Sequence, residues 1–233
     1  MSLQLIYHPL SSFCHKVLIA LYENGAAFEP RLIDLGDPAQ GAEFRALWPL
    51  AKIPVLRDLT RDETLPETSI IIEYLDQRYP GVRPLIPPDA AEALKVRLWD
   101  RFFDLYLQVP MQKIVADTFR AEGRHDADGV EEARATLRTA YSILDKQLAA
   151  GGWASGVEFS LADCAAAPAL FYAGVVASFE EHQHLAAYFD RLCGRASFIR
   201  VLKEAQAWFQ FFPMCSAIPE RFLNPGAETF ARG

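Results

Sequence analysis

The sequence predicts an α/β domain followed by an all-helical domain, and three observations support this. Near the N-terminus, an alternating apolar segment, a segment with helical apolar period and a second strand-like segment follow one another. The proline- and glycine-rich stretch 80–88 cannot continue a helix. Beyond Asp89, apolar residues recur at helical spacing almost throughout. We therefore expect an α/β domain at 1–80, a linker at 81–88 and an all-helical bundle at 89–233.

The α/β domain should begin with a strand, a helix and a second strand. Apolar residues alternate over 3–7, as in a short buried strand. Ser11 is suited to cap the following helix, and Asn24-Gly25 to end it. A second strand is expected at 28–34. This order requires a right-handed crossover between parallel strands.

The rest of the α/β domain should contain a hairpin and two helices. We expect a short helix at 42–47, hairpin strands at 53–56 and 63–65, and a helix at 67–78 with Ile70 on its apolar face.

In the helical domain, breaks are expected at 123–129, 151–160 and 177–181. Ser160 and Asp163 form the capping box S-x-x-D at the start of a buried helix. The aromatic tail should pack back over the bundle.

Composition excludes several classes of function. The net charge of −7 argues against nucleic acid as a partner, because phosphate-binding surfaces need clustered Lys and Arg. The cysteines form no C-x-x-C pair and the histidines no ligand cluster, so we expect no metal. No apolar run approaches the roughly 20 residues that span a bilayer, and the first residues do not resemble a signal peptide. We therefore expect no membrane partner and a cytoplasmic protein.

A serine and a cysteine lie at the start of the first helix, in Ser11-Ser12-Phe13-Cys14. A thioredoxin-type module carries C-x-x-C here, and serine in place of the first cysteine excludes dithiol exchange. The Ser11 hydroxyl can instead donate to a ligand thiolate, with the helix N-terminus adding positive potential. Lowering a thiol pKa of about 8.5 by about two units requires roughly 2.7 kcal/mol, within reach of one hydroxyl and one helix end. Simple helix capping is the alternative role of Ser11.

Two further segments are suited to a thiol peptide. A cis bond at Ile53-Pro54 would expose the Ile53 backbone to an extended ligand, although an edge-strand proline is the plainer interpretation. Glu67-Thr68 places an acid and a hydroxyl at the start of the next helix, where they suit an amine and a carboxylate. Ordinary capping is the alternative here too.

These motifs, in this order, resemble those of the soluble glutathione S-transferases, particularly the serine-type theta, zeta and tau classes and their bacterial relatives. The resemblance covers nearly the whole chain. It includes S-x-F-C-x-x-V-x-I-A-L from Ser11, K-I-P-V-L from Lys52, E-T-S from Glu67 and the Ser160 capping box. It implies a thioredoxin-like N-terminal domain, an all-α C-terminal domain and a homodimer.

Carried over by position, the resemblance implies a glutathione site. Ser11 would hold the glutathione thiolate, and Ile53, before Pro54, would pair with the cysteinyl backbone. Glu67 and Thr68 would hold the γ-glutamyl end. Lys52, with Gln40, would reach the glycyl carboxylate.

Two features depart from the family pattern. Thr68 stands where most relatives have serine, which keeps the hydroxyl and adds a methyl group. Cys14 lies one helical turn after Ser11 and is the alternative nucleophile, although at this helical position we expect its sulfur to point into the domain. Ser12 is a weaker candidate than either.

The second substrate should bind between the domains. Trp99, Phe103, Tyr106, Pro110 and Lys113 would share one helical stripe, with a kink at Pro110. A helical stripe of this kind more often packs in the protein core than lines a pocket. Its polar members lead us to expect that Phe103, Tyr106, Pro110 and Lys113 line an apolar cavity. Weaker candidates are Phe119, Phe171 and Tyr172.

The favoured function is conjugation of glutathione to an apolar electrophile, by electrostatic stabilisation and proximity. Disulfide or peroxide reduction is the alternative and would need Cys14. A non-catalytic binding protein of the same family is the third hypothesis. The sequence leaves the electrophile open among halides, epoxides, α,β-unsaturated carbonyls and isomerisation substrates.

Overall fold

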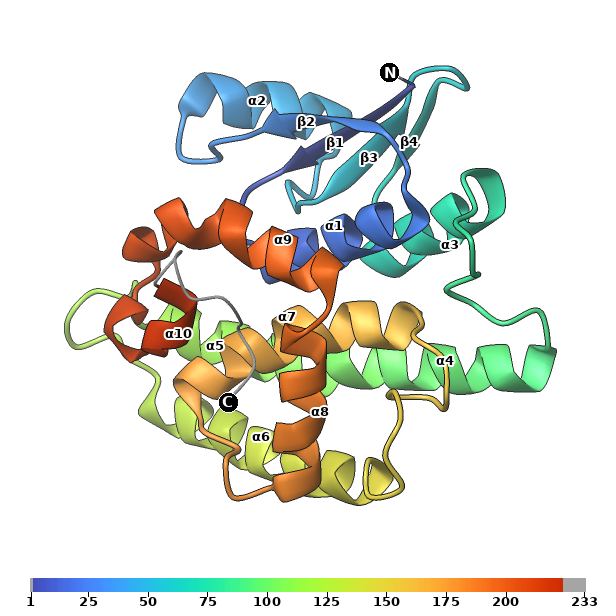
Figure 1. Ribbon diagram of the computed structural model, residues 1–233. Coiled ribbons are helices and arrows are strands. Elements are labelled where there is room, and N and C mark those ends of the chain that lie inside the picture. The colour runs from blue at the N-terminus through green and yellow to red at the C-terminus, as the bar shows by residue number, and fades with distance from the viewer. Residues whose placement is uncertain (1, 224–233) are drawn as a thin grey trace.

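A computed structural model of the chain describes residues 2–223 (Figure 1). Its N-terminal part contains a four-stranded sheet with strand order β2-β1-β3-β4. β1 pairs in parallel with β2 and antiparallel with β3, which pairs antiparallel with β4. The elements of this part are β1 (Leu3–Tyr7), α1 (Ser12–Asn24), β2 (Phe28–Leu32), α2 (Pro38–Leu47), β3 (Val55–Asp58), β4 (Glu63–Leu65) and α3 (Thr68–Arg78).

Helices cover both faces of this sheet (Figure 1). Ile6 and Val55 pack on one face with Phe44 of α2. Leu5 and Leu56 belong to the large core that includes α1 and α3 on the other face. Since α1 also packs against α7 and α9, it lies between the sheet and the helical part. The N-terminus of α1, which carries Ser11, is therefore placed where the two parts meet.

The C-terminal part is helical within the described residues. Its elements are α4 (Ala90–Phe103), the π-helical turn η1 (Asp104–Gln108), α5 (Val109–Asp117), α6 (Ala127–Gln147), α7 (Leu161–Val176), α8 (Gln183–Cys193), α9 (Ala196–Ala205), the 3₁₀ helices η2 (Gln206–Phe211) and η3 (Cys215–Ala217), and α10 (Glu220–Leu223). The predicted thioredoxin-like fold followed by a helical bundle is confirmed. The division of the chain at 81–88 stays a prediction.

Helix α7 forms the centre of the bundle, and nearly all of its side chains are buried. The predicted capping box opens it: Asp163 Oδ2 accepts from the Ser160 backbone N–H at 2.9 Å. Asp163 Oδ1 accepts from the Ala154 N–H at 2.9 Å and from the Tyr188 hydroxyl at 2.6 Å. These partners compensate the burial of the carboxylate.

Several boundaries differ from the sequence-based expectation. Helix α2 begins at Pro38 rather than at 42, because Asp37 caps it and accepts from the N–H groups of the first turn. The strand expected from residue 53 begins only at Val55, after a cis Ile53-Pro54 bond. Ile70, expected on the apolar face of α3, is 54% exposed.

The π-helical turn η1 sets the course of the long helix. The irregularity expected at Pro110 lies immediately before it, at Asp104–Gln108. A π turn contains more residues than an α turn, so it rotates the residues that follow relative to those before it. Residues spaced for a single stripe in a straight α-helix, such as Phe103 and Lys113, then no longer share one face.

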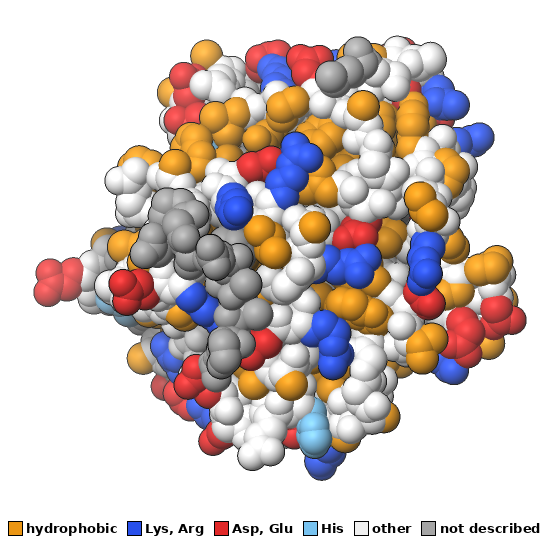
Figure 2. Space-filling model, in the orientation of Figure 1, with side chains coloured by type: hydrophobic (Ala, Val, Ile, Leu, Met, Phe, Trp, Pro, Cys, Tyr) orange, Lys and Arg blue, Asp and Glu red, His pale blue; other side chains and the backbone are white. Residues whose placement is uncertain are grey.

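The last described residues pack on the bundle as expected, with Phe209, Phe212, Ile218 and Phe222 buried. The rest of the predicted tail, 224–233, lies outside the described residues. Within 2–223, no helix combines the length and the apolar character needed to cross a membrane. On the face seen in Figure 2, basic and acidic side chains are interspersed.

Candidate functional site

A cavity of about 230 Å³ brings together two segments that the sequence analysis assigned to the site, 52–54 and 67–68. Lys52, Ile53, Pro54, Glu67 and Thr68 all line it. We call it the polar cavity. Its walls also include Phe13, Trp48, Arg101, Asp104, Leu105 and Val109, which the sequence analysis did not assign to the site.

Glu67 has an unusual backbone conformation. Its φ is 67° and its ψ 113°, and its side chain makes no capping hydrogen bond to α3. A non-glycine residue at positive φ costs on the order of 1–3 kcal/mol and tends to occur where function requires it. Ordinary helix capping, the structural alternative for Glu67, is therefore absent.

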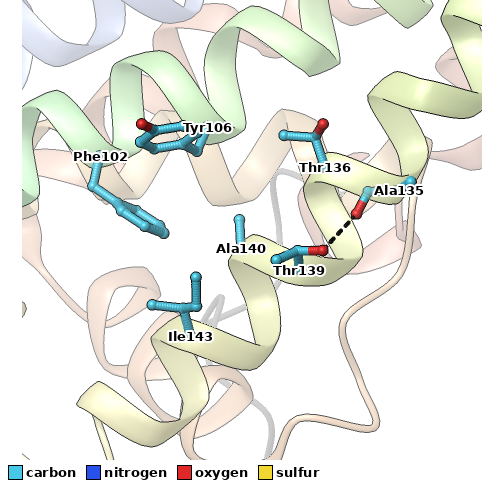
Figure 3. A pocket seen from close by; sticks show the side chains of 7 residues that line it. All are labelled: Phe102, Tyr106, Ala135, Thr136, Thr139, Ala140 and Ile143. Atoms are coloured by element: carbon cyan, nitrogen blue, oxygen red, sulfur yellow. Dashed lines mark hydrogen bonds between the residues drawn. The ribbon is translucent and has the colours of Figure 1, made fainter.

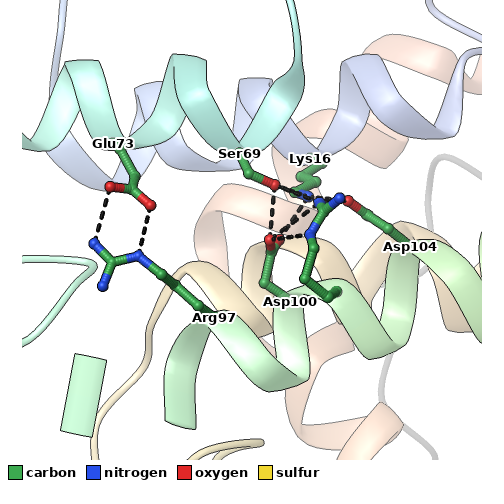
Figure 4. A network of polar contacts seen from close by, with 7 residues as sticks. Lys16, Ser69, Glu73, Arg97, Asp100 and Asp104 are labelled. Carbon is green, nitrogen blue, oxygen red and sulfur yellow. Dashed lines mark hydrogen bonds and ion pairs between the residues drawn. The ribbon is translucent and has the colours of Figure 1, made fainter. Parts of the chain in front are cut away.

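A buried ionic network lies behind the polar cavity (Figure 4). Lys16 of α1 is fully buried, and its Nζ lies 2.6 Å from Asp100 Oδ1 and 2.7 Å from Asp104 Oδ2. Ser69 of α3 accepts from Lys16 Nζ at 3.1 Å and donates to Asp100 Oδ2 at 2.7 Å. Arg101 pairs with both aspartates from the more exposed side. The network thus ties α1 and α3 of the N-terminal part to α4 and η1.

Asp104 belongs both to this network and to the wall of the polar cavity. It is 4% exposed, and its Oδ1 has no hydrogen-bond partner among the described residues. Burial raises the pKa of this carboxyl, Lys16 opposes the shift, and the neighbouring Asp100 adds to it. Asp104 Oδ1 is thus a buried carboxylate oxygen without a partner among the described residues.

Ser11 lies at the edge of a second cavity of about 510 Å³, beside the polar cavity. Its backbone adopts the extended N-cap conformation, and its Oγ accepts from the Cys14 N–H at 3.3 Å. Most walls of this second cavity are apolar, and we call it the apolar cavity. Phe13, two residues after Ser11, lines the polar cavity, so the start of α1 borders both.

Cys14 is completely buried. Burial raises the pKa of its thiol to about 12, and interactions with Ser11 and the His8 backbone oppose this only in part. The predicted inward orientation of the sulfur is confirmed. A thiol in this environment offers no accessible thiolate near neutral pH.

Cys14 in the native protein is therefore expected to resist iodoacetamide at pH 8, because the thiolate fraction is about 10⁻⁴ at four units below the pKa. Mass spectrometry after tryptic digestion measures the label, with denatured protein as the fully reactive reference. The partly exposed Cys215 serves as an internal control. Native labelling of Cys14 at the denatured rate would contradict its burial.

The structure does not bring the predicted electrophile residues to Ser11. Phe103 is fully buried in the core, and Pro110 is buried at the start of α5. Lys113 pairs with Asp126. Tyr106 instead lines a third cavity, of about 530 Å³, together with Phe102, Ala140 and Ile143 (Figure 3). The rotation introduced by η1 explains this dispersal.

The other predicted residues also lie in different places, some at the apolar cavity and some outside both cavities. Gln40 does not line the polar cavity, and its Oε1 accepts from the Asp34 N–H at 3.1 Å. Phe119, Tyr172 and Ser12 line the apolar cavity. Phe171 does not, and stacks on Phe209 with 5.5 Å between ring centres.

Some of the unassigned cavity residues carried a weak signal. Arg101 and Asp104 are charged residues within a largely apolar helical stretch. Met111 and Val115 are four residues apart, so they mark one face of α5 once the rotation introduced by η1 is known. The rotation of the helix after η1 is what the sequence does not predict. The described residues contain no group of three or more potential metal ligands.

Comparison with known proteins agrees with this geometry. The family model "Glutathione S-transferase, N-terminal domain" matches residues 5–83, and "Glutathione S-transferase, C-terminal domain" matches residues 127–191. A glutathione S-transferase of Pseudomonas putida is 30% identical over 154 residues, which cover 66% of this chain and 67% of the relative. The chain belongs to the glutathione S-transferase family.

Two further similar proteins guide the interpretation. A glutathione S-transferase of Methylobacillus flagellatus, crystallised with GSH bound, superimposes with a TM-score of 0.79 at 29% identity, covering 86% of this chain and 98% of its own. A stringent starvation protein A homolog of Haemophilus influenzae is 28% identical over 196 residues, covering 83% of this chain and 86% of the relative. The second relative is not named as a transferase.

Proposed function

We propose that the protein is a serine-type glutathione transferase that conjugates glutathione to an apolar electrophile. The charge pattern of the polar cavity carries the proposal. Glutathione has one ammonium and two carboxylates at neutral pH, and the cavity wall contains Lys52 and Arg101 for the carboxylates, and Glu67 and Asp104 for the ammonium. The GSH-bound structure of the Methylobacillus flagellatus relative supports the same ligand.

Each part of the peptide then has a partner. Glu67, whose side chain makes no capping hydrogen bond, accepts from the γ-glutamyl ammonium, and Thr68 donates to the carboxylate of the same residue. The Ile53 backbone, held by the cis bond to Pro54, pairs with the cysteinyl residue. Lys52 binds the glycyl carboxylate. Gln40 has no part in this arrangement.

The thiol lies where the two cavities meet, at the start of α1. Ser11 donates its O–H to the thiolate, and the N-terminal N–H groups of α1 add positive potential. The apolar cavity beside Ser11 holds the electrophile, whose carbon is attacked by the thiolate. Catalysis consists of keeping the thiol ionised at neutral pH and bringing the two reactants together.

The two other hypotheses have less support. Disulfide or peroxide reduction needs a reactive Cys14. This cysteine is buried, and burial raises the pKa of its thiol to about 12. A non-catalytic binding protein agrees with the Haemophilus influenzae relative but leaves the charges of the polar cavity without a ligand. Calorimetric titration with glutathione tests the proposal, because a protein that does not use glutathione should release no binding heat.

Replacing Glu67 by glutamine is expected to weaken glutathione binding about 10- to 100-fold. The change removes the negative charge of the acceptor, and a hydrogen bond between charged groups is worth about 1.5–3 kcal/mol. The dissociation constant from calorimetry measures the effect. Glu122→Gln, the same change at an exposed loop position, is the control and should bind as the wild type does. Equal affinity of both variants would exclude Glu67 from the site.

We also propose that the protein is a cytoplasmic homodimer, in which a second copy covers the outer side of α4 and α6. Leu98 is 60% exposed there, close to the third cavity lined by Phe102 and Tyr106. Light scattering should give the mass of a dimer for the wild type and of a monomer for Leu98→Asp. Val157→Asp, at a position 88% exposed, is the control and should remain dimeric. A monomeric wild type would contradict this proposal.

A further inference from the structure

The apolar cavity is lined by segments from both ends of the described chain. The start of α1 supplies Ser11, and the segment 211–213 supplies a second part of the wall. This segment is reached through α9 and η2, which follow one another without a loop. The placement of α9 therefore decides where the segment 211–213 lies relative to Ser11. The proposed function depends on that distance, because the electrophile must lie against the thiolate.

Helix α9 packs along α1 and runs in the opposite direction (Figure 1). Its start is joined to the end of α1. There the two carboxylate oxygens of Glu23 accept from Nε and Nη2 of Arg195, the N-cap residue of α9, at 2.8 and 2.7 Å. The Ser197 hydroxyl donates to the same carboxylate. We call Glu23, Arg195 and Ser197 the Glu23 clasp.

The geometry of the Glu23 clasp makes it a precise contact. A bidentate pair between guanidinium and carboxylate fixes orientation as well as distance. The Glu23 side chain is 17% exposed and that of Arg195 33%. The guanidinium carbon of Arg195 also lies 4.0 Å from the centre of the Phe159 ring and 5.3 Å from that of Trp153. The Arg195 side chain is thus held by aromatic rings as well as by Glu23.

The other contacts described between α1 and the segment 196–211 are looser. The Tyr22 hydroxyl donates to Glu204 Oε2 at 2.6 Å, but this pair is exposed and competes with water. Beyond α9, the rings of Trp208 and His8 meet edge to face with 5.0 Å between their centres. Neither contact fixes the position of α9 as closely as the bidentate pair does.

We propose that Glu23 is a positioning residue for the reaction. Through Arg195 and Ser197 it fixes α9 on α1, and thereby sets the width of the apolar cavity beside Ser11. The inference rests on the proposed function and adds to it a determinant of substrate size. Glu23 lines neither the polar nor the apolar cavity, so it touches neither reactant. Without the clasp, the segment 211–213 can move away from Ser11, and the cavity discriminates less by size.

The variant Glu23→Gln tests the inference in the full-length protein. Benzyl chloride and 1-(chloromethyl)naphthalene carry the same reactive group and differ by one fused ring. The ratio of kcat/KM for the smaller halide to kcat/KM for the larger is expected to fall about tenfold, because a misplacement of about 1 Å by a distant change can cost about 100-fold. The dissociation constant of glutathione, from calorimetry, should change less than about twofold.

Glu73→Gln is the matched control. Glu73 of α3 accepts from Arg97 Nε and Nη2 of α4 at 2.8 and 2.9 Å (Figure 4). It is the same bidentate pair between the N-terminal and helical parts, away from α9, and its loss should leave the ratio within about twofold. Arg195→Lys keeps the charge of the Glu23 clasp but not the bidentate contact. It should give an intermediate ratio, and it tests the same contact should Glu23→Gln not fold.

Hydrogen–deuterium exchange gives a second readout that needs no catalysis. Peptides within 196–213 should exchange faster in Glu23→Gln than in the wild type, and at the wild-type rate in Glu73→Gln. An unchanged ratio or unchanged exchange in Glu23→Gln would overturn the inference, as would an equal effect of Glu73→Gln. A wild type that binds no glutathione, or conjugates neither halide, would instead show that the proposed function has failed, and the inference with it.

Discussion

Replacing Lys16 by methionine is expected to lower the free energy of unfolding by about 3–5 kcal/mol. Lys16 is fully buried, and its ammonium neutralises Asp100 and Asp104, which are 2% and 4% exposed. Methionine fills a similar volume but leaves two buried carboxylates without their cation. Removing one partner of a buried ion pair is strongly destabilising, because it leaves the other charge buried and unpaired. Replacing all members of the pair by apolar residues costs much less.

The control for this variant is Lys95→Met. Lys95 pairs with Glu92 at 2.7 Å, as closely as Lys16 pairs with Asp104, but both side chains are at least half exposed. An exposed pair is worth about 0–1 kcal/mol, so the same substitution should have little effect there. Urea unfolding followed by circular dichroism compares the two variants. Equal midpoints would show that the Lys16 network does not stabilise the fold.

The loss in Lys16→Met should depend on pH. The pKa of Asp104 is raised in the folded protein, mainly by burial. A carboxyl with a raised folded pKa favours the folded state at low pH, where it is neutral, and this contribution is lost as the pH rises through that pKa. The difference in stability between wild type and Lys16→Met should therefore shrink on acidification toward pH 4. A difference that grows on acidification would contradict the assignment of the buried charge.

Replacing Ser11 by alanine is expected to lower kcat/KM for conjugation about 100-fold. The hydroxyl supplies about 1.5–3 kcal/mol of preference for the thiolate, and each 1.4 kcal/mol corresponds to a factor of ten. The same change removes the cap of α1, at a cost of about 1 kcal/mol in stability. Kinetics with glutathione and an apolar halide, measured well below the melting temperature, separate the two effects.

Two variants control this experiment. Ser11→Thr keeps a hydroxyl at the same position and should retain most of the activity. Ser12→Ala removes the neighbouring hydroxyl, which lines the apolar cavity but does not cap the helix, and should change kcat/KM less than Ser11→Ala does. Full conjugation activity in Ser11→Ala would exclude Ser11 as the donor to the thiolate.

The sequence was sufficient where local chemistry determines the structure. The alternation over 3–7 and the cap at Ser11 predicted β1 and the start of α1, and the Ser160 capping box predicted the start of α7. The residues expected around glutathione also meet in one cavity, Gln40 and Ser11 excepted. The signals for β1, α1 and α7 lie within a few residues of the feature they predict, whereas the glutathione residues were expected from the family resemblance.

It was insufficient where distant contacts decide. The π turn η1 begins at Asp104, whose carboxylate is held by Lys16, 88 residues earlier. No local pattern encodes that contact, and the turn displaces every later residue of the helix from the predicted stripe. The helix expected at 42–47 begins four residues earlier for another reason: Pro38 occupies the first turn of α2, where proline is favourable.

The pKa of the bound glutathione thiol tests the central proposal most directly. Ultraviolet absorbance of the thiolate, followed against pH at saturating glutathione, measures it for the wild type and for Ser11→Ala. The site described above predicts a bound thiol about two units below the free value of about 8.5, and a return toward the free value in Ser11→Ala. A wild-type complex that titrates like free glutathione, or a Ser11→Ala complex that titrates like the wild type, would contradict it.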